Sequence, residues 1–493
     1  MANSFFGLTI GTSGLYAANA NLNVTANNIA NQNTKGYSRQ QAVQQATTAL
    51  RVYQRYGAVG TGVEVTEINR TRDEYYDVKY WKNNSKLGEH TTKNYYMRQL
   101  EDYFNDSDES GFSVEFQNIY DALETLSNDA GSLTARASVI NYAKSFLEYM
   151  NEIKTNITLM QEDINAEINN NVDKINALST EIATINKQIN VIELTGANAN
   201  ELRDKRAVLL DELSGIVEIE TNEITYENGK SEFYVTVGNK SLVNNYDAFS
   251  LKVVTRENLS DTDDAVGLYD VKWSYGDDFN VVSEDIRGSL YSLIMVRDGN
   301  NNEAETGNAN SKPIDYKGVP YYYDEVNKFL DTFTSQFNEI QSRGMGLNGE
   351  SGADNPIFLV SDNKVYTVND ALLKDPSLLC TTTNVHQGVA SKDLLEELIK
   401  TKNSKDYEGG SAIEYLNTLV TEIAIDTKKA ENMQTNYTNI QKTISNQRLS
   451  IMGVDPDEEA MNIVKFKEAY DLSAKIISVM NEIYQKLINE TGV

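Results

Sequence analysis

The chain has 493 residues, which is too long for one compact core and indicates roughly two to four domains. Apolar residues make up 40% and charged residues 24%, proportions that are ordinary for a folded protein and exclude wholesale disorder. Acidic residues outnumber basic ones 72 to 44, and the formal charge of −28 repels phosphate backbones and anionic lipids, so we expect neither nucleic acid nor a membrane as a partner.

The start of the chain is unusual because its first acidic residue is Glu64. It lacks the basic, apolar and small-residue regions of a secretory signal peptide, so we expect no cleaved signal. No run reaches the roughly 20 apolar residues that a membrane-spanning helix needs. Cys380 is the only cysteine, which rules out an intrachain disulfide and suits either the cytosol or a protein that is exported unfolded through a narrow channel.

The first predicted element is a helix over residues 4–31, followed by a strand over residues 60–68. Four apolar side chains recur one heptad apart in this helix: Leu8, Leu15, Leu22 and Ile29. Such a narrow stripe must be covered by another helix. The helix should fray in isolation because it holds three glycines, each costing about 1 kcal/mol relative to alanine. They are Gly7, Gly11 and Gly14.

Helices are expected next from about residue 70 to 104 and over residues 112–128. The longest one runs from about 133 to 193, where apolar residues follow the a/d pattern of a coiled coil and neither proline nor glycine occurs. A shorter helix over residues 199–213 can fold back beside it.

Beyond Gly215 the pattern changes to alternating apolar residues, with an Asn-Gly hairpin turn at 228–229. This pattern, which predicts β-strands, continues to about residue 297, and a helix is expected at about 321–343. Helices return at roughly 391 and continue to the C-terminus, with a break at Gly453.

The last helix should begin at Asp455, because an N-cap aspartate, Pro456 and Glu458 together form a helix-start pattern. Four apolar residues in it recur at the same heptad spacing as those of the first helix: Ile463, Tyr470, Ile477 and Tyr484. Neither stripe has another obvious cover in the chain. We therefore expect the two stripes to meet, in the same or in a neighbouring subunit, as the subunit-assembly site.

The predicted fold is mainly α with an inserted β-rich region, in an elongated multidomain chain whose terminal helices pair in a coiled-coil-like bundle. Three domains are expected. They are a terminal helical assembly domain (1–59 with 454–493), a long helical bundle (60–215 with 391–453) and a β-rich, solvent-facing part (216–390).

Residues typical of catalysis are scarce. The two histidines, His90 and His386, lie in no zinc-binding or triad arrangement, and no phosphate-binding glycine loop occurs. Asp298 opens a stretch like a calcium loop, but Glu303 and Ala309 stand where glycine and glutamate are required, so an EF-hand is rejected. We expect no enzyme, no cofactor and no metal. A pair of catalytic carboxylates like that of a glycosidase is still an open alternative, because the distance between two carboxylates in space cannot be read from the sequence.

Both ends of the chain resemble a known family. ANNIANQNTKGYSRQ (26–40) resembles the N-terminal motif of bacterial flagellar axial proteins, the rod, hook and hook-associated subunits, and residues 457–488 resemble their C-terminal helix. Three further features resemble the hook-associated members of this family: GYSRQ, the long helices over 112–213 with LRDKRAVLLDELS, and FNEIQSRGMGLNGESGADNPIF (337–358).

The resemblance implies paired terminal helices lining an inner tube, a helical layer outside it and β-rich domains facing solvent. It also implies a structural subunit of the hook–filament junction in the extracellular flagellum, exported uncleaved through the flagellar type III channel. Expected partners are other copies in a helical assembly, the hook protein, the next hook-associated protein and an export chaperone on the C-terminal helix. The terminal segments would stay mobile in the free monomer and fold as their stripes meet.

Two other readings stay open. The chain could be the hook protein or another axial subunit, although the hook protein lacks a long helix like the one expected over residues 133–193. It could instead be a secreted surface protein whose β-rich part hydrolyses or binds glycans.

Overall fold

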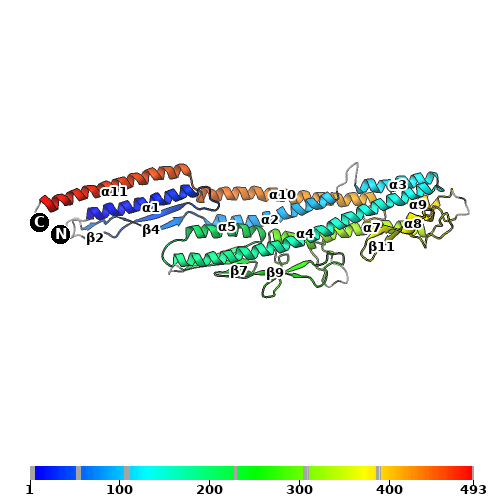
Figure 1. The fold of residues 1–493 in the computed structure, drawn as a ribbon, viewed down its shortest axis with the longest axis horizontal. Coiled ribbons are helices and arrows are strands. Elements are labelled where there is room, and N and C mark those ends of the chain that lie inside the picture. The colour runs from blue at the N-terminus through cyan, green and yellow to red at the C-terminus, as the bar shows by residue number, and fades with distance from the viewer. Residues whose placement is uncertain are drawn as a thin grey trace. The chain divides into compact units, whose positions relative to one another are not determined.

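The computed structural model describes residues 6–51, 57–104, 111–226, 230–303, 308, 310–384, 388 and 390–490. The expected turn at 228–229 and His386 lie outside these residues. Helices dominate the described part, with small antiparallel sheets between them (Figure 1). The predicted fold class, mainly α with inserted β structure and paired terminal helices, is confirmed.

The helices, in chain order, are α1 (Phe6–Asn31), α2 (Glu74–Tyr103), α3 (Phe112–Asn128), α4 (Leu133–Glu193), α5 (Asn200–Ile216), α6 (Ser289–Asp298), α7 (Val319–Ser342), α8 (Asp370–Lys374), α9 (Asp393–Thr401), α10 (Ala412–Met452) and α11 (Pro456–Glu490), with a 3-10 turn at Pro376–Leu378. None of the described helices has the length and apolar character that a membrane crossing requires.

The strands are β1 (Gln40–Ala46), β2 (Leu50–Arg51), β3 (Ala58–Val59), β4 (Val63–Arg70), β5 (Glu220–Thr225), β6 (Ser231–Val237), β7 (Lys240–Asn244), β8 (Asp247–Ala248), β9 (Leu251–Thr255), β10 (Tyr269–Trp273), β11 (Phe358–Val360) and β12 (Tyr366–Val368). Strands β5 to β8 form one antiparallel meander, and the others pair in twos, as β1 with β4. Side chains on β6 alternate between buried and half-buried, as expected for a strand with one covered face.

The long helix predicted over residues 133–193 is α4, with the same bounds. Its a/d isoleucines, from Ile157 to Ile189, are fully buried within the chain. Burial of this regular stripe is what holds so long a helix together, because helices gain most of their stability from packing.

Asparagines on α4 bind the backbone of the inserted β structure. Asn176 donates to the carbonyl of Leu251 and accepts from its N–H, both at 2.8 Å. Asn165 accepts from the N–H of Tyr269 at 2.8 Å, and Asn151 donates to the carbonyl of Tyr366 at 2.7 Å. These side chains therefore satisfy strand and loop backbone that would otherwise be buried without partners.

One predicted element is wrong. Residues 289–298 were expected to continue the β-rich region, but they form α6, in which most side chains are buried. A short apolar run that is covered on all sides has no period that separates strand from helix.

The chain divides into two compact units. The first comprises residues 1–87, 173–251 and 437–493, and the second comprises 88–172 and 252–436. Phenylalanines from α3, α4, α7 and β11 form the core of the second unit; they include Phe116, Phe146, Phe329, Phe333 and Phe358. The finer three-domain division stays a prediction.

Candidate assembly site on the terminal helices

The terminal helices α1 and α11 pack against each other as an antiparallel pair within the first unit (Figure 1). Gly7 lies against Met480, Gly11 against Ile477 and Gly14 against Ser473. A Cβ on Gly14 would lie 2.8 Å from Oγ of Ser473, and one on Gly11 would lie 3.0 Å from Cγ1 of Ile477. The three glycines therefore permit a close helix–helix approach that offsets their cost to the isolated helix.

The rest of the covered face of α1 consists of small and polar side chains. Its buried residues are Gly11, Ala17, Ala18, Asn21, Val24, Thr25 and Asn28. The four predicted apolar residues of this helix are all half-buried: Leu8, Leu15, Leu22 and Ile29. They flank the small-residue face, so the helix pair of a single chain covers them only in part.

The predicted residues of α11 are half-buried as well: Ile463, Tyr470, Ile477 and Tyr484. They share the side of α11 that faces α1 with Met480 and Ser473, which also lie against α1 glycines. The structure thus brings the two predicted stripes onto one helix pair.

A second apolar stripe on α11 was missed by the sequence reasoning. Five side chains of this outer stripe are 43–63% exposed: Leu472, Ile476, Val479, Ile483 and Leu487. Met461 and Val464 extend the exposed apolar surface toward the start of the helix. Leu472 and Val479, like Ile476 and Ile483, are seven residues apart, so a search for a second, interleaved heptad could have found the stripe. Contiguous apolar surface of this kind marks an interaction site.

The start of α11 is held by the loop that follows α1. Asp455 accepts hydrogen bonds from the N–H groups of Asp457 and Glu458, which confirms the predicted N-cap. Glu458 pairs with Arg39 at 2.7 Å, and Arg39 also binds Glu459 at 2.6 Å. Glu459 is 1% exposed, so this ion pair is largely shielded from solvent.

The rest of the GYSRQ motif (36–40) is held just as tightly. Gly36 has a φ of +81°, and a Cβ there would collide with Val208 of α5. Ser38 donates from its N–H and from Oγ to Asp204 at 2.8 and 2.7 Å. The side chain of Asn28 donates to the carbonyl of Gln40 and accepts from its N–H, both at 2.9 Å.

Asp204 belongs to LRDKRAVLLDELS, the other motif that carried the resemblance. This carboxylate is 5% exposed and also pairs with Arg70 at 2.9 Å. The two motifs therefore meet in one buried cluster that fixes the end of α1 against α5.

Asp298, Cys380 and His90 lie in surroundings that disfavour reactivity or metal binding. Asp298, which opens the rejected calcium loop, lies between Arg256 at 2.6 Å and Arg297 at 2.7 Å. Burial raises the pKa of the Cys380 thiol to about 12, so the thiolate is disfavoured. His90 is half-buried, and burial lowers its pKa.

Three family models match the chain. Residues 97–358 match the flagellar hook-associated protein FlgK helical domain. Residues 8–37 match the flagella basal body rod protein, and residues 445–490 match the C-terminal part of the flagellar basal body rod FlgEFG protein.

Relatives cover the chain almost from end to end. Flagellar hook-associated protein 1 of Bacillus subtilis (strain 168) is 27% identical over 522 residues, which cover 100% of this chain and 99% of the relative. The protein of the same name from Salmonella typhimurium is 24% identical over 550 residues, covering 97% of this chain and 98% of the relative.

A solved structure has a similar fold. It is the flagellar hook junction protein FlgK from Burkholderia pseudomallei, with a TM-score of 0.58 and 11% sequence identity, and the match covers 77% of this chain and 100% of that one.

Proposed function

The chain belongs to the family of flagellar hook-associated proteins that share the FlgK helical domain, and we propose that its α1–α11 pair carries the contacts by which it assembles. It is a structural subunit of the junction between the flagellar hook and the filament. The 61-residue helix α4 argues against the alternative that the chain is the hook protein, because the hook protein lacks such a long helix. Similarity over the full chain likewise disfavours a glycan-binding or glycan-hydrolysing protein.

The observation that carries the assembly proposal is the outer stripe of α11. Within one chain, α1 covers one side of α11 and leaves most of this second apolar side exposed, although Ile476 at its edge also lies near Gly11. Full burial of a large apolar side chain contributes about 1.5–3 kcal/mol, so five half-exposed ones are a strong driving force for association. A neighbouring copy presents the same helix pair, and contacts that repeat without closing build a helical assembly.

In this proposal the eight predicted residues have two roles. Their buried halves hold α1 against α11 within a subunit, and their exposed halves join the outer stripe in contacts between subunits. Leu8, Leu15, Leu22 and Ile29 supply the α1 side of that contact, and Ile463, Tyr470, Ile477 and Tyr484 supply the α11 side. The terminal domain (1–59 with 454–493) is then the assembly domain, and residues 216–390 face solvent.

We infer three further partners: the hook protein, the next hook-associated protein and an export chaperone. The hook protein and the next hook-associated protein bind the two ends of the junction. An export chaperone covers the apolar sides of α11 before assembly, since an exposed stripe would otherwise promote aggregation. The chain leaves the cell through the type III channel without a cleaved signal, reaches the extracellular flagellum and has no enzymatic role there.

Deleting the gene tests the proposed function. Cells without the protein should keep their hooks, lose their filaments and shed flagellin into the medium, as seen by electron microscopy and immunoblotting of culture supernatants. Normal filaments on such cells would refute the junction role.

A further inference from the structure

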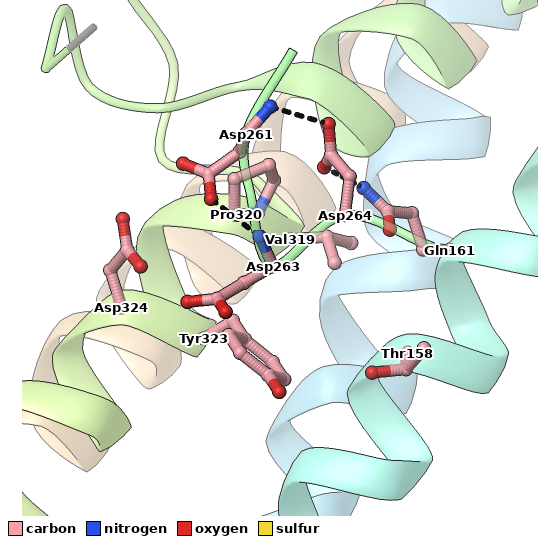
Figure 2. Close-up of a pocket in the computed structure, with 9 residues that line it drawn as sticks. All are labelled: Thr158, Gln161, Asp261, Asp263, Asp264, Val319, Pro320, Tyr323 and Asp324. Carbon is pink, nitrogen blue, oxygen red and sulfur yellow. Dashed lines mark hydrogen bonds between the residues drawn. The ribbon is translucent and has the colours of Figure 1, made fainter. Parts of the chain in front are cut away.

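Three carboxylates from two separate elements converge in the second unit (Figure 2). Asp261 and Asp263 lie in the connection between β9 and β10, and Asp324 lies on α7. One oxygen of each lies within 4.8 Å of the other two. Because calcium–oxygen distances are about 2.4 Å, oxygens this close together need only a small shift to share one ion.

Two of these carboxylates differ in their surroundings. Lys364 pairs with Oδ2 of Asp263 at 2.6 Å. The carboxylate of Asp324, in contrast, has no hydrogen bond or ion pair with any residue that the structure describes. A half-buried carboxylate in such surroundings is unfavourable unless a cation joins it.

A buried amide provides an independent sign of a missing ligand. Asn327 follows Asp324 by one helical turn and is 2% exposed. Its Nδ2 donates to Oδ2 of Asp263 at 3.0 Å, which fixes the orientation of the amide beside the cluster. Its Oδ1 is buried and has no hydrogen-bond partner in the described part of the chain. An unpaired buried acceptor costs about 1–3 kcal/mol, and a bound cation or its hydration water would remove that cost.

The loop that carries two of the aspartates is held in place by other contacts. Gln161 of α4 donates to Asp264 at 2.6 Å, and Asp264 accepts from the N–H of Asp261 at 3.0 Å (Figure 2). The N–H of Asp263 donates to Asp261 at 2.9 Å. A small pocket lies among these residues, and Pro320 and Tyr323 form part of its wall. The aspartates thus line a pocket together with a loop that is held by hydrogen bonds within the chain.

We propose that Asp261, Asp263 and Asp324 bind one calcium ion, with Asn327 as a neutral oxygen ligand. The donor set consists of oxygens alone, which excludes the nitrogen and sulfur preferences of zinc. Ligands drawn from a loop and a helix suit calcium, which accepts flexible geometry, whereas magnesium requires a near-ideal octahedron. The ion ties the β9–β10 connection to α7. Because Lys364 already neutralises part of the charge, the affinity should fall in the weak range of extracellular calcium modules, with a Kd of roughly 10⁻⁴–10⁻³ M.

Calcium titration of the full-length protein, after removal of metal with a chelator, tests the proposal. Isothermal titration calorimetry should show one ion bound per chain, and saturating calcium should raise the melting temperature more than magnesium does at equal ionic strength. Asp324→Asn should weaken calcium binding at least roughly tenfold, because the site loses one of its three charged ligands. Glu339→Gln removes the same charge from an exposed position on α7 and should bind calcium like the wild type.

Asp324→Asn is expected to fold, because it removes a repelled charge rather than a partner, and its melting temperature in chelator should equal or exceed that of the wild type. Asn327→Leu fills the same space without an oxygen and should also weaken binding. The proposal is wrong if the wild type shows no saturable calcium binding, if Asp324→Asn binds as tightly as the wild type, or if magnesium stabilises the protein equally.

Discussion

Gly11 of α1 lies so close to Ile477 of α11 that a Cβ on the glycine would be 3.0 Å from Cγ1 of the isoleucine. The contact joins two residues that are 466 positions apart, and it places a residue with a poor helix propensity where only a small one fits. The terminal helices are therefore matched to each other by shape as well as by apolar character.

Gly11→Leu should separate this helix pair. The added side chain meets both Ile477 and Ile476, and overpacking of this kind costs about 1–3 kcal/mol even though leucine favours helix. We expect faster hydrogen exchange over residues 456–490 and loss of junction assembly. Gly60→Ala is the control, because no atom of the described residues lies within 4 Å of the new Cβ. Unchanged exchange in Gly11→Leu would show that the close approach is not required.

Val479→Asp should abolish assembly and leave the monomer folded. Val479 is 45% exposed, so the aspartate remains solvated in the free chain but would be buried without a partner in a subunit contact. Complementation of a deletion strain should give hooks without filaments. Ser478→Asp adds the same charge at the adjacent exposed position, off the outer stripe, and should restore filaments. Equal filament counts for the two variants would refute the assembly role of the stripe.

Much of the α-helical structure could be predicted because its apolar residues keep a strict period. The a/d isoleucines of α4 define its length, and Asp455 with Pro456 defines the start of α11. Strand β1 was missed, since QQAVQQA has neither strong β propensity nor apolar alternation and pairs only because β4 lies beside it.

Only part of the candidate assembly site could be predicted from the sequence. Heptad spacing found Ile477 but could not show that its neighbours would be glycines, because contact between chain ends is a tertiary property. The outer stripe lies on the same helix as the predicted heptad of Ile477, so a search for one heptad did not find Val479. Asp324 lies 61 positions after Asp263, and no local pattern connects them.

Asp204→Asn should destabilise the first unit. The carboxylate accepts from Ser38 and pairs with Arg70 in a buried setting, and removal of one partner from such a pair costs about 3 kcal/mol. Urea denaturation should show a lower midpoint with an unchanged slope. Glu212→Gln, at an exposed position of the same helix, should leave the midpoint unchanged. A wild-type midpoint for Asp204→Asn would mean that the two motifs do not stabilise each other.

The pH dependence of stability should reveal the carboxylate cluster when calcium is chelated. Burial and the charges of Asp261 and Asp263 raise the pKa of Asp324 in the folded state from its ordinary value of 3.8 to about 7, so between these values the folded state holds more protons than the unfolded state. The contribution of Asp324 to the free energy of unfolding therefore falls as the pH rises from about 4 to about 7, and levels off above that.

Asp324→Asn cannot ionise and should lack this loss. Its stability relative to the wild type should rise across the same pH interval in chelator, as measured by urea denaturation at several pH values. Saturating calcium should reduce the difference at pH 8, because the wild type gains more binding energy than the variant does. A difference between the two proteins that stays constant from pH 4 to pH 8 would show that Asp324 titrates normally and that its neighbours do not repel it.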